Sequence, residues 1–271
     1  MRPLPGRLVL LGHPVDHSLS PTFQNAALRR AALPLTYEAL DVPVSGLDAT
    51  LDALVAGGAS GTVTIPHKER VATRCARLTT LAERVGAVNT FWVENGNLVG
   101  DNTDVGGFLE LLAATAPDAD RARPVAVLGA GGAAAAVFVA LEQAGFVRIR
   151  VHARSAARAR SLSLRFPAST VASTVEDAVR GAALVVNATP LGLDGQSVPV
   201  DVELLDRDAA LLDLVVHRDE TPVVRAARAR GHRAADGLEM LLGQGALAFE
   251  RWFGIAPDRA VMRASVGRQH A

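Results

Sequence analysis

The chain has 271 residues, 49% of them hydrophobic and 21% charged, and its 28 basic and 28 acidic side chains give a formal net charge of zero. This balance gives no electrostatic basis for binding nucleic acid or an anionic membrane surface. The single cysteine, Cys75, excludes an internal disulfide framework and a cysteine-based zinc site. Because the apolar run near the N-terminus is too short for a signal-peptide core, we expect a reduced, cytoplasmic protein with room for two domains of ordinary size.

The use of lysine is unusual. Of the 28 basic residues only Lys68 is a lysine, and the other 27 are arginine. Arginine stays protonated in proteins, whereas a lysine amine can lose its proton. Lys68 is therefore a candidate for proton transfer.

The N-terminal part of the chain alternates apolar strands with helices. We expect strands over residues 7–12, 35–40 and 60–65, and helices from Ser20, over 47–56, and from Pro66 to about Arg77 with Cys75 inside the last. Ser20, followed by Pro21, is expected to cap its helix. The hydroxyl of Ser18 then stays free to help receive a carboxylate.

Polar side chains gather where these strands end. The helix from Pro66 places Lys68 in its first turn, where the helix dipole favours the neutral amine. A hairpin over 86–93 and 97–100, turning at Asn95-Gly96, and a polar stretch leading into a helix over 108–113 follow. Thr64, Lys68, Asn89 and Asp104 then lie at or just beyond strand ends, where ligands bind in open α/β sheets. A simpler interpretation of Asp104 is an acid at the start of its helix.

After a polar linker over 116–123, a new unit begins with the apolar strand 125–128 and a glycine turn. Gly129, Gly131 and Ala134 fit the dinucleotide-binding pattern Gly-x-Gly-x-x-Ala. Gly129 allows backbone angles closed to other residues, Gly131 lacks the Cβ that would keep a pyrophosphate away, and Ala134 lets the helix pack close to its strand. The uncharged run 124–141 is long enough to span a bilayer, but the glycine break argues against that interpretation.

The second strand of this unit, over 147–152, is followed by Arg154, Ser155 and Arg158 instead of an acidic residue. An acid here would bind the ribose diol of NAD, whereas arginines suit a 2′-phosphate, so the pattern favours NADP. The alternative interpretation is a solvated helix face, because further arginines follow. The remaining expected elements are strands over 170–172, 184–187, 210–216 and 232–235, and helices over 221–230, 237–252 and 258–266.

A series of motifs follows one another along nearly the whole chain. They are Gly-x-Pro-x-x-His-Ser-Leu-Ser-Pro, Val-Thr-Ile-Pro-x-Lys, Gly-Ala-Val-Asn-Thr, Gly-Asp-Asn-Thr-Asp, Gly-Ala-Gly-Gly-Ala, Asn-Ala-Thr-Pro-x-Gly, Glu-Thr-Pro and Asp-Gly-Leu-x-Met-Leu-x-x-Gln. With these motifs in this order, the chain resembles the shikimate dehydrogenases. The resemblance implies the reversible, NADPH-dependent reduction of 3-dehydroshikimate to shikimate, on the route to chorismate and the aromatic amino acids.

The resemblance also implies an α/β fold with two domains and an active site in the cleft between them. Residues 1–104 plus 237–271 would form the substrate domain, and residues 105–236 would form a Rossmann-type NADP-binding domain. We expect small-molecule ligands, no nucleic-acid or membrane partner, no metal, and a monomer or homodimer.

Site residues are carried over from the family one at a time. Lys68 and Asp104 would be the catalytic acid–base pair, with Lys68 delivering a proton to the carbonyl oxygen as the nicotinamide transfers its hydride. Ser18 and Ser20 would hold the substrate carboxylate. The substrate hydroxyls would be bound by Thr64, Asn89, Asp104 and Gln244. The cofactor would be bound by Gly129, Ala130, Gly131, Gly132, Ala133, Arg154, Ser155, Arg158, Thr189, Leu214 and Gly237.

Several positions depart from the family pattern. Thr62 stands where asparagine is common, Ala153 replaces the first residue of the family's Asn-Arg-Thr, and Val216 replaces a tyrosine that helps hold the substrate carboxylate. Val216 keeps a quinate or aminoshikimate dehydrogenase open as an alternative. A non-catalytic, NADP-binding regulatory module is a second alternative, against which the intact Lys68 and Asp104 weigh.

Overall fold

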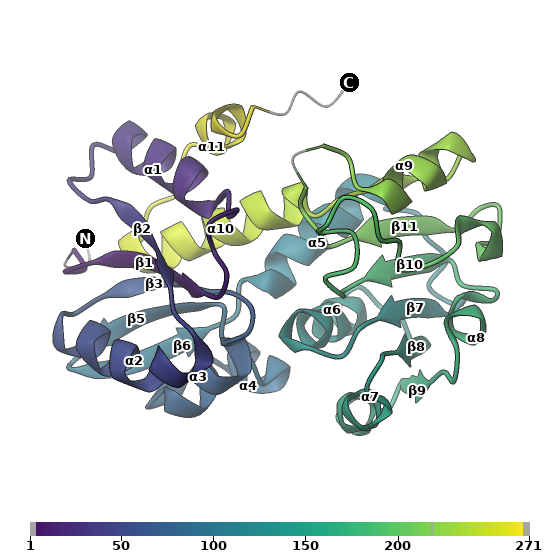
Figure 1. Cartoon of the computed structure of the whole chain (residues 1–271), viewed down its shortest axis with the longest axis horizontal. Helices are drawn as coiled ribbons and strands as arrows, with labels where there is room; N and C mark the ends of the chain where they lie inside the picture. Colours follow the sequence, from purple (N-terminus) through teal and green to yellow (C-terminus); the bar gives the residue numbers. More distant parts are fainter. Residues whose placement is uncertain (1–3, 218, 268–271) are drawn as a thin grey trace. The chain divides into compact units, whose positions relative to one another are not determined.

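The computed structural model describes residues 4–217 and 219–267, which divide into two compact units. One unit holds the residues up to Asp104 together with those from Leu242 onward, and the other holds Val105–Leu241. Each unit is built on a six-stranded sheet with helices packed against it (Figure 1). The predicted α/β fold class is confirmed.

The sheet of the first unit is mixed. Its strands lie in the order β2 (Tyr37–Asp41), β1 (Leu8–Gly12), β3 (Ser60–Val63), β5 (Thr90–Glu94), β6 (Asn97–Asp101) and β4 (Arg77–Leu78). Strand β1 pairs in parallel with β2 and β3, and β5 pairs antiparallel with β3 and β6. The β5–β6 hairpin turns at Asn95 and Gly96, whose φ angles of 53° and 72° are the left-handed values that an Asn-Gly turn requires, as predicted.

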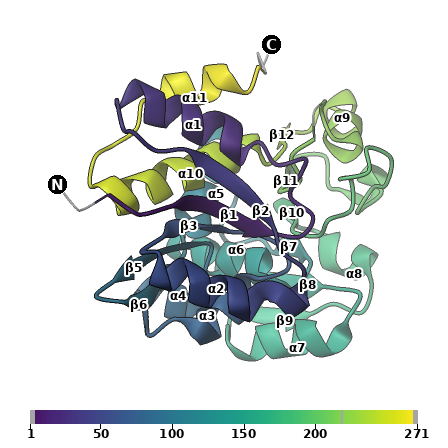
Figure 2. The ribbon, with the colours of Figure 1, turned by 60° about the vertical axis from the view of Figure 1, so that its left-hand side comes forward.

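Helices cover both faces of this sheet (Figure 2). One face packs against α2 (Leu47–Ala56), α3 (Lys68–Arg74) and α4 (Thr80–Val85), and a short 3₁₀ helix, η1 (Val44–Gly46), leads into α2. The other face packs against α1 (Ser20–Arg30) and α10 (Leu238–Phe253), with α11 (Arg259–Ser265) lying outside on α1. Alternation along the strands produces this arrangement, since Val9 and Leu11 of β1 share one apolar cluster with Leu51 of α2.

The sheet of the second unit is parallel throughout. Its strands lie in the order β9 (Ser169–Val171), β8 (Ile149–His152), β7 (Val125–Leu128), β10 (Leu184–Asn187), β11 (Ala210–Asp213) and β12 (Ala234–Ala235). Counted from β7, this is the order 3-2-1-4-5-6 of the doubly wound dinucleotide-binding fold. The winding direction reverses between β7 and β10, which is where such folds bind their cofactor.

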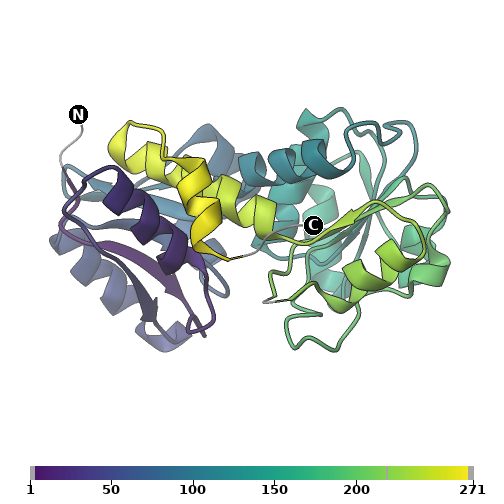
Figure 3. The ribbon, with the colours of Figure 1, turned by 90° about the horizontal axis from the view of Figure 1, so that it is seen from above.

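Helices lie on both faces of this second sheet as well. The apolar residues of α8 (Val175–Val179) and α9 (Pro222–Ala229) form one cluster with Ala126 and Leu128 of β7. Figure 3 shows α9 on one side of the sheet and α5 (Asp104–Thr115) and α6 (Gly132–Gln143) on the other. Helix α7 (Ala156–Leu164) follows β8, and η2 (Val202–Leu204) precedes β11.

The uncharged run that begins at residue 124 folds as β7, a glycine turn and α6. Every residue of α6 from Ala134 to Leu141 is buried, so the apolar character of this run serves the protein core. Within residues 4–217 and 219–267, no helix is both long and apolar enough to cross a membrane.

Several elements differ from their predicted bounds. The helix expected from Pro66 to Arg77 begins only at Lys68 and ends at Arg74, because Cys75 is extended and Arg77 begins β4. Strand β11 ends at Asp213, earlier than the expected Val216. The short helices α4 and α8 are missing from the prediction, since one or two turns carry too few apolar positions to show a helical period.

Candidate active site

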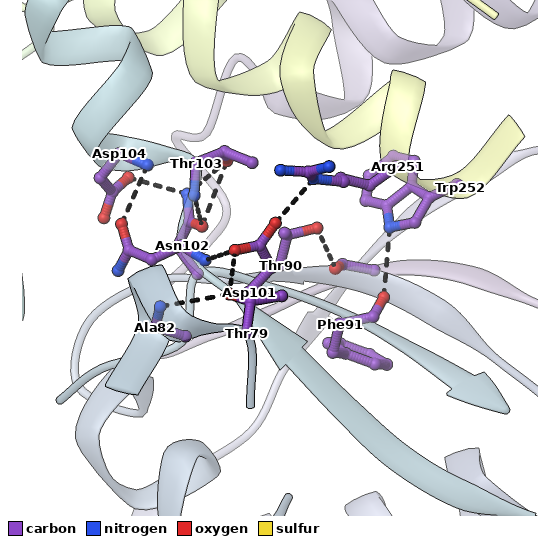
Figure 4. Close-up of polar contacts among 12 residues, drawn as sticks. Thr79, Ala82, Thr90, Phe91, Asp101, Asn102, Thr103, Asp104, Arg251 and Trp252 are labelled. Atoms are coloured by element: carbon purple, nitrogen blue, oxygen red, sulfur yellow. Dashed lines mark hydrogen bonds and ion pairs between the residues drawn. The ribbon is translucent and has the colours of Figure 1, made fainter. Parts of the chain in front are cut away.

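A polar turn over residues 101–104, held by its own side chains, joins β6 to α5 (Figure 4). The Asp101 carboxylate accepts the backbone N–H of Asn102 at 2.8 Å, and the side-chain oxygen of Asn102 accepts that of Asp104 at 3.1 Å. The Asn102 amide also donates to the carbonyl oxygen of Ala87 at 2.9 Å. All four residues of the turn are buried. Helix α5 therefore begins at Asp104, four residues earlier than the expected Phe108.

Lys68 and Asp104 form a buried ion pair. The Nζ atom of Lys68 lies 2.5 Å from Oδ2 of Asp104, and the two side chains are only 15% and 5% exposed. Lys68 is the first residue of α3, and its backbone carbonyl accepts the N–H of Val88, which anchors the start of the helix beside β5. Asp104 does lie at a helix start, as the simpler interpretation expected, and it also compensates the charge of the chain's single lysine.

Asn89, just before β5, connects this ion pair to further polar side chains. Its Nδ2 lies 2.8 Å from Oδ1 of Asp104, 2.9 Å from Oγ1 of Thr103 and 3.1 Å from Oε1 of Gln244 on α10. Its Oδ1 accepts the backbone N–H of Thr103 at 2.6 Å. Four of the sequence-predicted site residues, Lys68, Asn89, Asp104 and Gln244, thus form one cluster of polar contacts.

The two serines at the start of α1 have roles different from those expected of them. Ser20 is the first residue of α1 and not its N-cap, and the hydroxyl of Ser18 accepts the backbone N–H of Ser20 at 3.2 Å. The expectation that Ser20 caps the helix and leaves Ser18 free is therefore wrong. Thr64 lies in the loop between β3 and α3. Its methyl group packs against Gly12, where an added Cβ would lie 2.3 Å from the methyl carbon of Thr64.

The glycine turn of the second unit distinguishes two kinds of glycine. Gly129 has a φ of 119°, and a Cβ at this position would lie 2.7 Å from the carbonyl oxygen of Ala188. Gly131 is extended, and a Cβ there would meet nothing within 4 Å. Since Gly131 occupies the N-cap of α6 without a capping side chain, the first N–H groups of that helix lie open to an anion.

The loop after β10 is tied to β11 from inside the unit. The Asn187 amide donates to the Asp213 carboxylate at 2.7 Å and to the Leu191 carbonyl oxygen at 3.0 Å. The Asn187 oxygen accepts both the backbone N–H of Thr189 at 3.0 Å and its hydroxyl at 2.6 Å. Burial raises the pKa of Asp213, and the hydrogen bonds it accepts from Asn187 and the backbone of Val215 only partly offset this. Thr189 is held by this network beside the glycine turn.

Exposed residues follow β8, the strand next to β7. Arg154, Ser155 and Arg158 lie at the surface, and the Ser155 hydroxyl caps α7 by accepting the backbone N–H of Arg158 at 3.3 Å. Two further cofactor candidates pack backbone to backbone, since a Cβ on Gly237 would lie 2.3 Å from the carbonyl oxygen of Leu214.

Comparison with known proteins agrees with this architecture. The sequence model of the shikimate dehydrogenase substrate binding domain matches residues 10–91, and that of the shikimate 5′-dehydrogenase C-terminal domain matches residues 237–266. The NADP(+) shikimate dehydrogenase of Mesorhizobium japonicum is 43% identical over 261 residues, which cover 94% of this chain and 93% of that protein. The chain belongs to the shikimate dehydrogenase family.

Solved structures of two related dehydrogenases share this fold. Shikimate 5-dehydrogenase from Thermus thermophilus, in complex with NADP(H) and shikimate, matches 96% of this chain and 98% of its own with a TM-score of 0.86 and 39% identity. Quinate dehydrogenase from Corynebacterium glutamicum, in complex with NAD, matches 95% of this chain and 97% of its own with a TM-score of 0.85 and 31% identity. The sequence-based expectation of an NADP-dependent oxidoreductase of the shikimate dehydrogenase family is confirmed.

One departure from the shikimate dehydrogenase pattern has a structural explanation. Thr62 on β3 makes a hydroxyl–hydroxyl hydrogen bond with Tyr37 on β2, across β1, and both side chains are buried. Burial raises the pKa of Tyr37 well above its usual range. Thr62 therefore satisfies a buried polar group of the core.

Two buried acids were not singled out by the sequence analysis, although Asp101 lies within the quoted Gly-Asp-Asn-Thr-Asp motif. Asp213 holds Asn187, and Asp101 holds the turn that ends at Asp104. Only the fold shows which neighbouring group each of these acids fixes.

The two glycines predict opposite results on replacement by alanine. Gly129→Ala should destabilise the protein by about 1–3 kcal/mol, because the new Cβ meets backbone and the φ angle is unfavourable. Gly131→Ala should leave the melting temperature unchanged and weaken NADP binding about tenfold, since its Cβ fills space that a pyrophosphate would occupy. Thermal unfolding and NADP titration by fluorescence measure the two effects.

Gly46→Ala serves as the control, because its Cβ would make only ordinary contacts, the nearest at 3.7 Å. Unchanged NADP affinity in Gly131→Ala would contradict the assignment of this turn to the pyrophosphate.

Proposed function

We propose that this protein is an NADP-dependent shikimate dehydrogenase, which reduces 3-dehydroshikimate to shikimate and catalyses the reverse oxidation. One observation carries the proposed mechanism: the only lysine of the chain forms a buried ion pair with Asp104. Membership of the shikimate dehydrogenase family supplies the reaction, and the ion pair supplies the acid–base group that the reaction requires.

Lys68 is the proton donor in the reduction. Bound NADPH supplies the hydride to the C3 carbonyl carbon, and the Lys68 ammonium gives a proton to the carbonyl oxygen, so that a hydroxyl forms. The Asp104 carboxylate, 2.5 Å from Nζ, holds the ammonium in place, and the Asn89 amide fixes the carboxylate from its other oxygen. In the oxidation the neutral Lys68 amine takes the proton from the same hydroxyl.

The substrate is bound by groups around this pair. Ser18 and Ser20 bind its carboxylate at the start of α1, and Thr64, Asn89, Asp104 and Gln244 bind its hydroxyls. Support comes from the position of the two serines at the N-terminus of α1, where Ser20 is the first helical residue and Ser18 lies two residues before it, because a helix N-terminus is a favourable place for an anion. The first unit, up to Asp104 and from Leu242 onward, acts as the substrate domain, whereas residues 237–241, which were expected in it, belong to the second unit.

The cofactor is bound by the second unit, Val105–Leu241, which extends five residues beyond the expected boundary at 236. Gly129, Ala130, Gly131, Gly132 and Ala133 receive the pyrophosphate, and Thr189, Leu214 and Gly237 complete the cofactor site. Arg154, Ser155 and Arg158 bind the 2′-phosphate, which their exposure at the end of β8 supports. The cytoplasmic location and a monomeric or homodimeric state stay predictions.

Val216 favours a second candidate, a quinate dehydrogenase. Valine offers no hydroxyl for the substrate carboxylate at this half-buried position after β11. A relative of 31% identity is a quinate dehydrogenase in complex with NAD. The arginines that follow β8 weigh against this candidate, because they favour a 2′-phosphate.

The proposed function is tested by initial rates with shikimate and quinate, each offered with NADP⁺ and with NAD⁺, followed by the absorbance of reduced nicotinamide. We expect rapid turnover with shikimate and NADP⁺ and much slower turnover with the other pairs. Preference for quinate would replace the proposal with the second candidate. Absence of turnover with every pair, in protein that binds NADPH, would favour the non-catalytic module.

Cofactor choice predicts a selective loss. Arg154→Ala and Arg158→Ala should each raise the KM for NADP⁺ about tenfold and leave the KM for NAD⁺ nearly unchanged, because each removes a charge-assisted contact to the 2′-phosphate. Arg160→Ala, a change of another exposed arginine on α7, is the matched control. Equal losses for both cofactors would contradict the assignment.

Lys68→Arg tests the proton-transfer role. The guanidinium keeps the positive charge beside Asp104 but cannot release a proton at neutral pH, so kcat should fall about 100- to 10,000-fold. NADP binding, measured by titration, should stay at the wild-type value. A kcat within a few-fold of the wild type would remove Lys68 from the chemistry.

A further inference from the structure

Helix α10 contacts the polar cluster around Asp104 at two places on one face. Gln244 accepts from the Asn89 amide at 3.1 Å, and two turns further on the Nε atom of Arg251 lies 2.7 Å from Oδ2 of Asp101 (Figure 4). The next residue, Trp252, donates its indole N–H to the carbonyl oxygen of Phe91 on β5. The C-terminal half of α10 is therefore fastened to β5 and to the end of β6.

Asp101 is a buried carboxylate whose Oδ1 accepts hydrogen bonds, whereas its Oδ2 accepts none among the described residues and has Arg251 as its ion-pair partner. Its side chain is 1% exposed, whereas that of Arg251 is 54% exposed, so the arginine reaches in from the surface. Its Oδ1 accepts the Thr79 hydroxyl at 2.5 Å and the backbone N–H of Asn102 at 2.8 Å, and its Oδ2 faces Arg251. The Thr79 hydroxyl also caps α4. A carboxylate removed from water in this way depends on such partners for its stability.

Asp101 is linked to Asp104 by two consecutive hydrogen bonds from backbone N–H groups to side-chain oxygens. Asp101 fixes the N–H of Asn102, and Asn102 fixes the N–H of Asp104. The backbone carbonyl of Asp101 also accepts the N–H of Asn89, the residue that orients the Asp104 carboxylate. Movement of Asp101 would therefore displace both Asp104 and Asn89.

We propose, resting on the proposed function, that Arg251 and Asp101 are positioning residues that hold the 101–104 turn so that Asp104 presents Lys68 to the substrate. Neither residue is a proton donor. Arg251 acts through Asp101, and Asp101 acts through the backbone of Asn102 and Asp104. The same ion pair sets the register of α10, which places Gln244 beside Asn89.

The proposal predicts a specific kinetic pattern in Arg251→Gln, Asp101→Asn and the double variant. Each single variant should lower kcat about 10- to 100-fold and raise the KM for shikimate, because the groups that meet the substrate lose their alignment. The double variant should have a kcat no lower than that of the slower single variant, since both changes remove the same Arg251–Asp101 interaction. The Kd for NADP should be unchanged in all three, and Arg251→Lys, which keeps the charge, should recover part of the rate.

Arg77→Gln is the matched control. It removes an arginine–carboxylate pair with Glu94 in the same sheet, but both partners are about half exposed and neither contacts the 101–104 turn. Rates are normalised to folded protein by thermal unfolding and NADP titration. Losses that match the fall in folded protein, with the KM for shikimate unchanged, or fully additive losses in the double variant, would overturn the proposal.

Hydrogen exchange gives a readout that does not depend on turnover. The backbone N–H groups of Asn102 and Asp104 should exchange faster in Arg251→Gln and Asp101→Asn than in the wild type or in Arg77→Gln. If the wild type turns over no shikimate, the proposed function fails, but hydrogen exchange still tests whether Arg251 and Asp101 hold the 101–104 turn. Unchanged exchange at the turn in both variants would overturn the inference, whatever the substrate.

Discussion

The buried ion pair between Lys68 and Asp104 is the constraint on which the first unit depends. Taking two charges out of water costs several kcal/mol per ion unless geometry and further hydrogen bonds compensate. The compensation comes from three places. The start of α3 supplies Lys68, the turn into α5 supplies Asp104, and Asn89, just before β5, binds the second carboxylate oxygen. The position of the Lys68 amine therefore depends on the correct folding of all three segments.

The 101–104 turn concentrates negative charge, since it buries two carboxylates three residues apart. Each is compensated by a different cation, Asp104 by Lys68 on α3 and Asp101 by Arg251 on α10. These helices lie on opposite faces of the sheet (Figure 2). Both helical layers thus meet at the end of β6, which explains why a C-terminal helix belongs to the same compact unit as the N-terminal strands.

Local chemistry made part of this structure predictable. The Asn95-Gly96 turn and the glycine fingerprint before α6 have short-range physical causes and form as expected. Asn89, expected at the end of a strand, instead lies just before the start of β5. Features that depend on tertiary contacts were missed. The roles of Ser18 and Ser20 depend on where α1 begins, and α3 ends early because β4 joins β6. Arg251 is one of 27 arginines, and nothing in the sequence singles it out as the partner of Asp101.

The two cations of the turn differ in what their positions require of them. Arg251 reaches Asp101 from the surface, and its task there is to supply a permanent positive charge in a fixed direction, which a guanidinium does well. Lys68 lies at the other carboxylate, where the proposed reaction requires a cation that can give up its proton and take it back. Wherever a cation only positions its neighbours, arginine is sufficient. The proposed chemistry requires a lysine at one position only, and Lys68, the only lysine of the chain, occupies it.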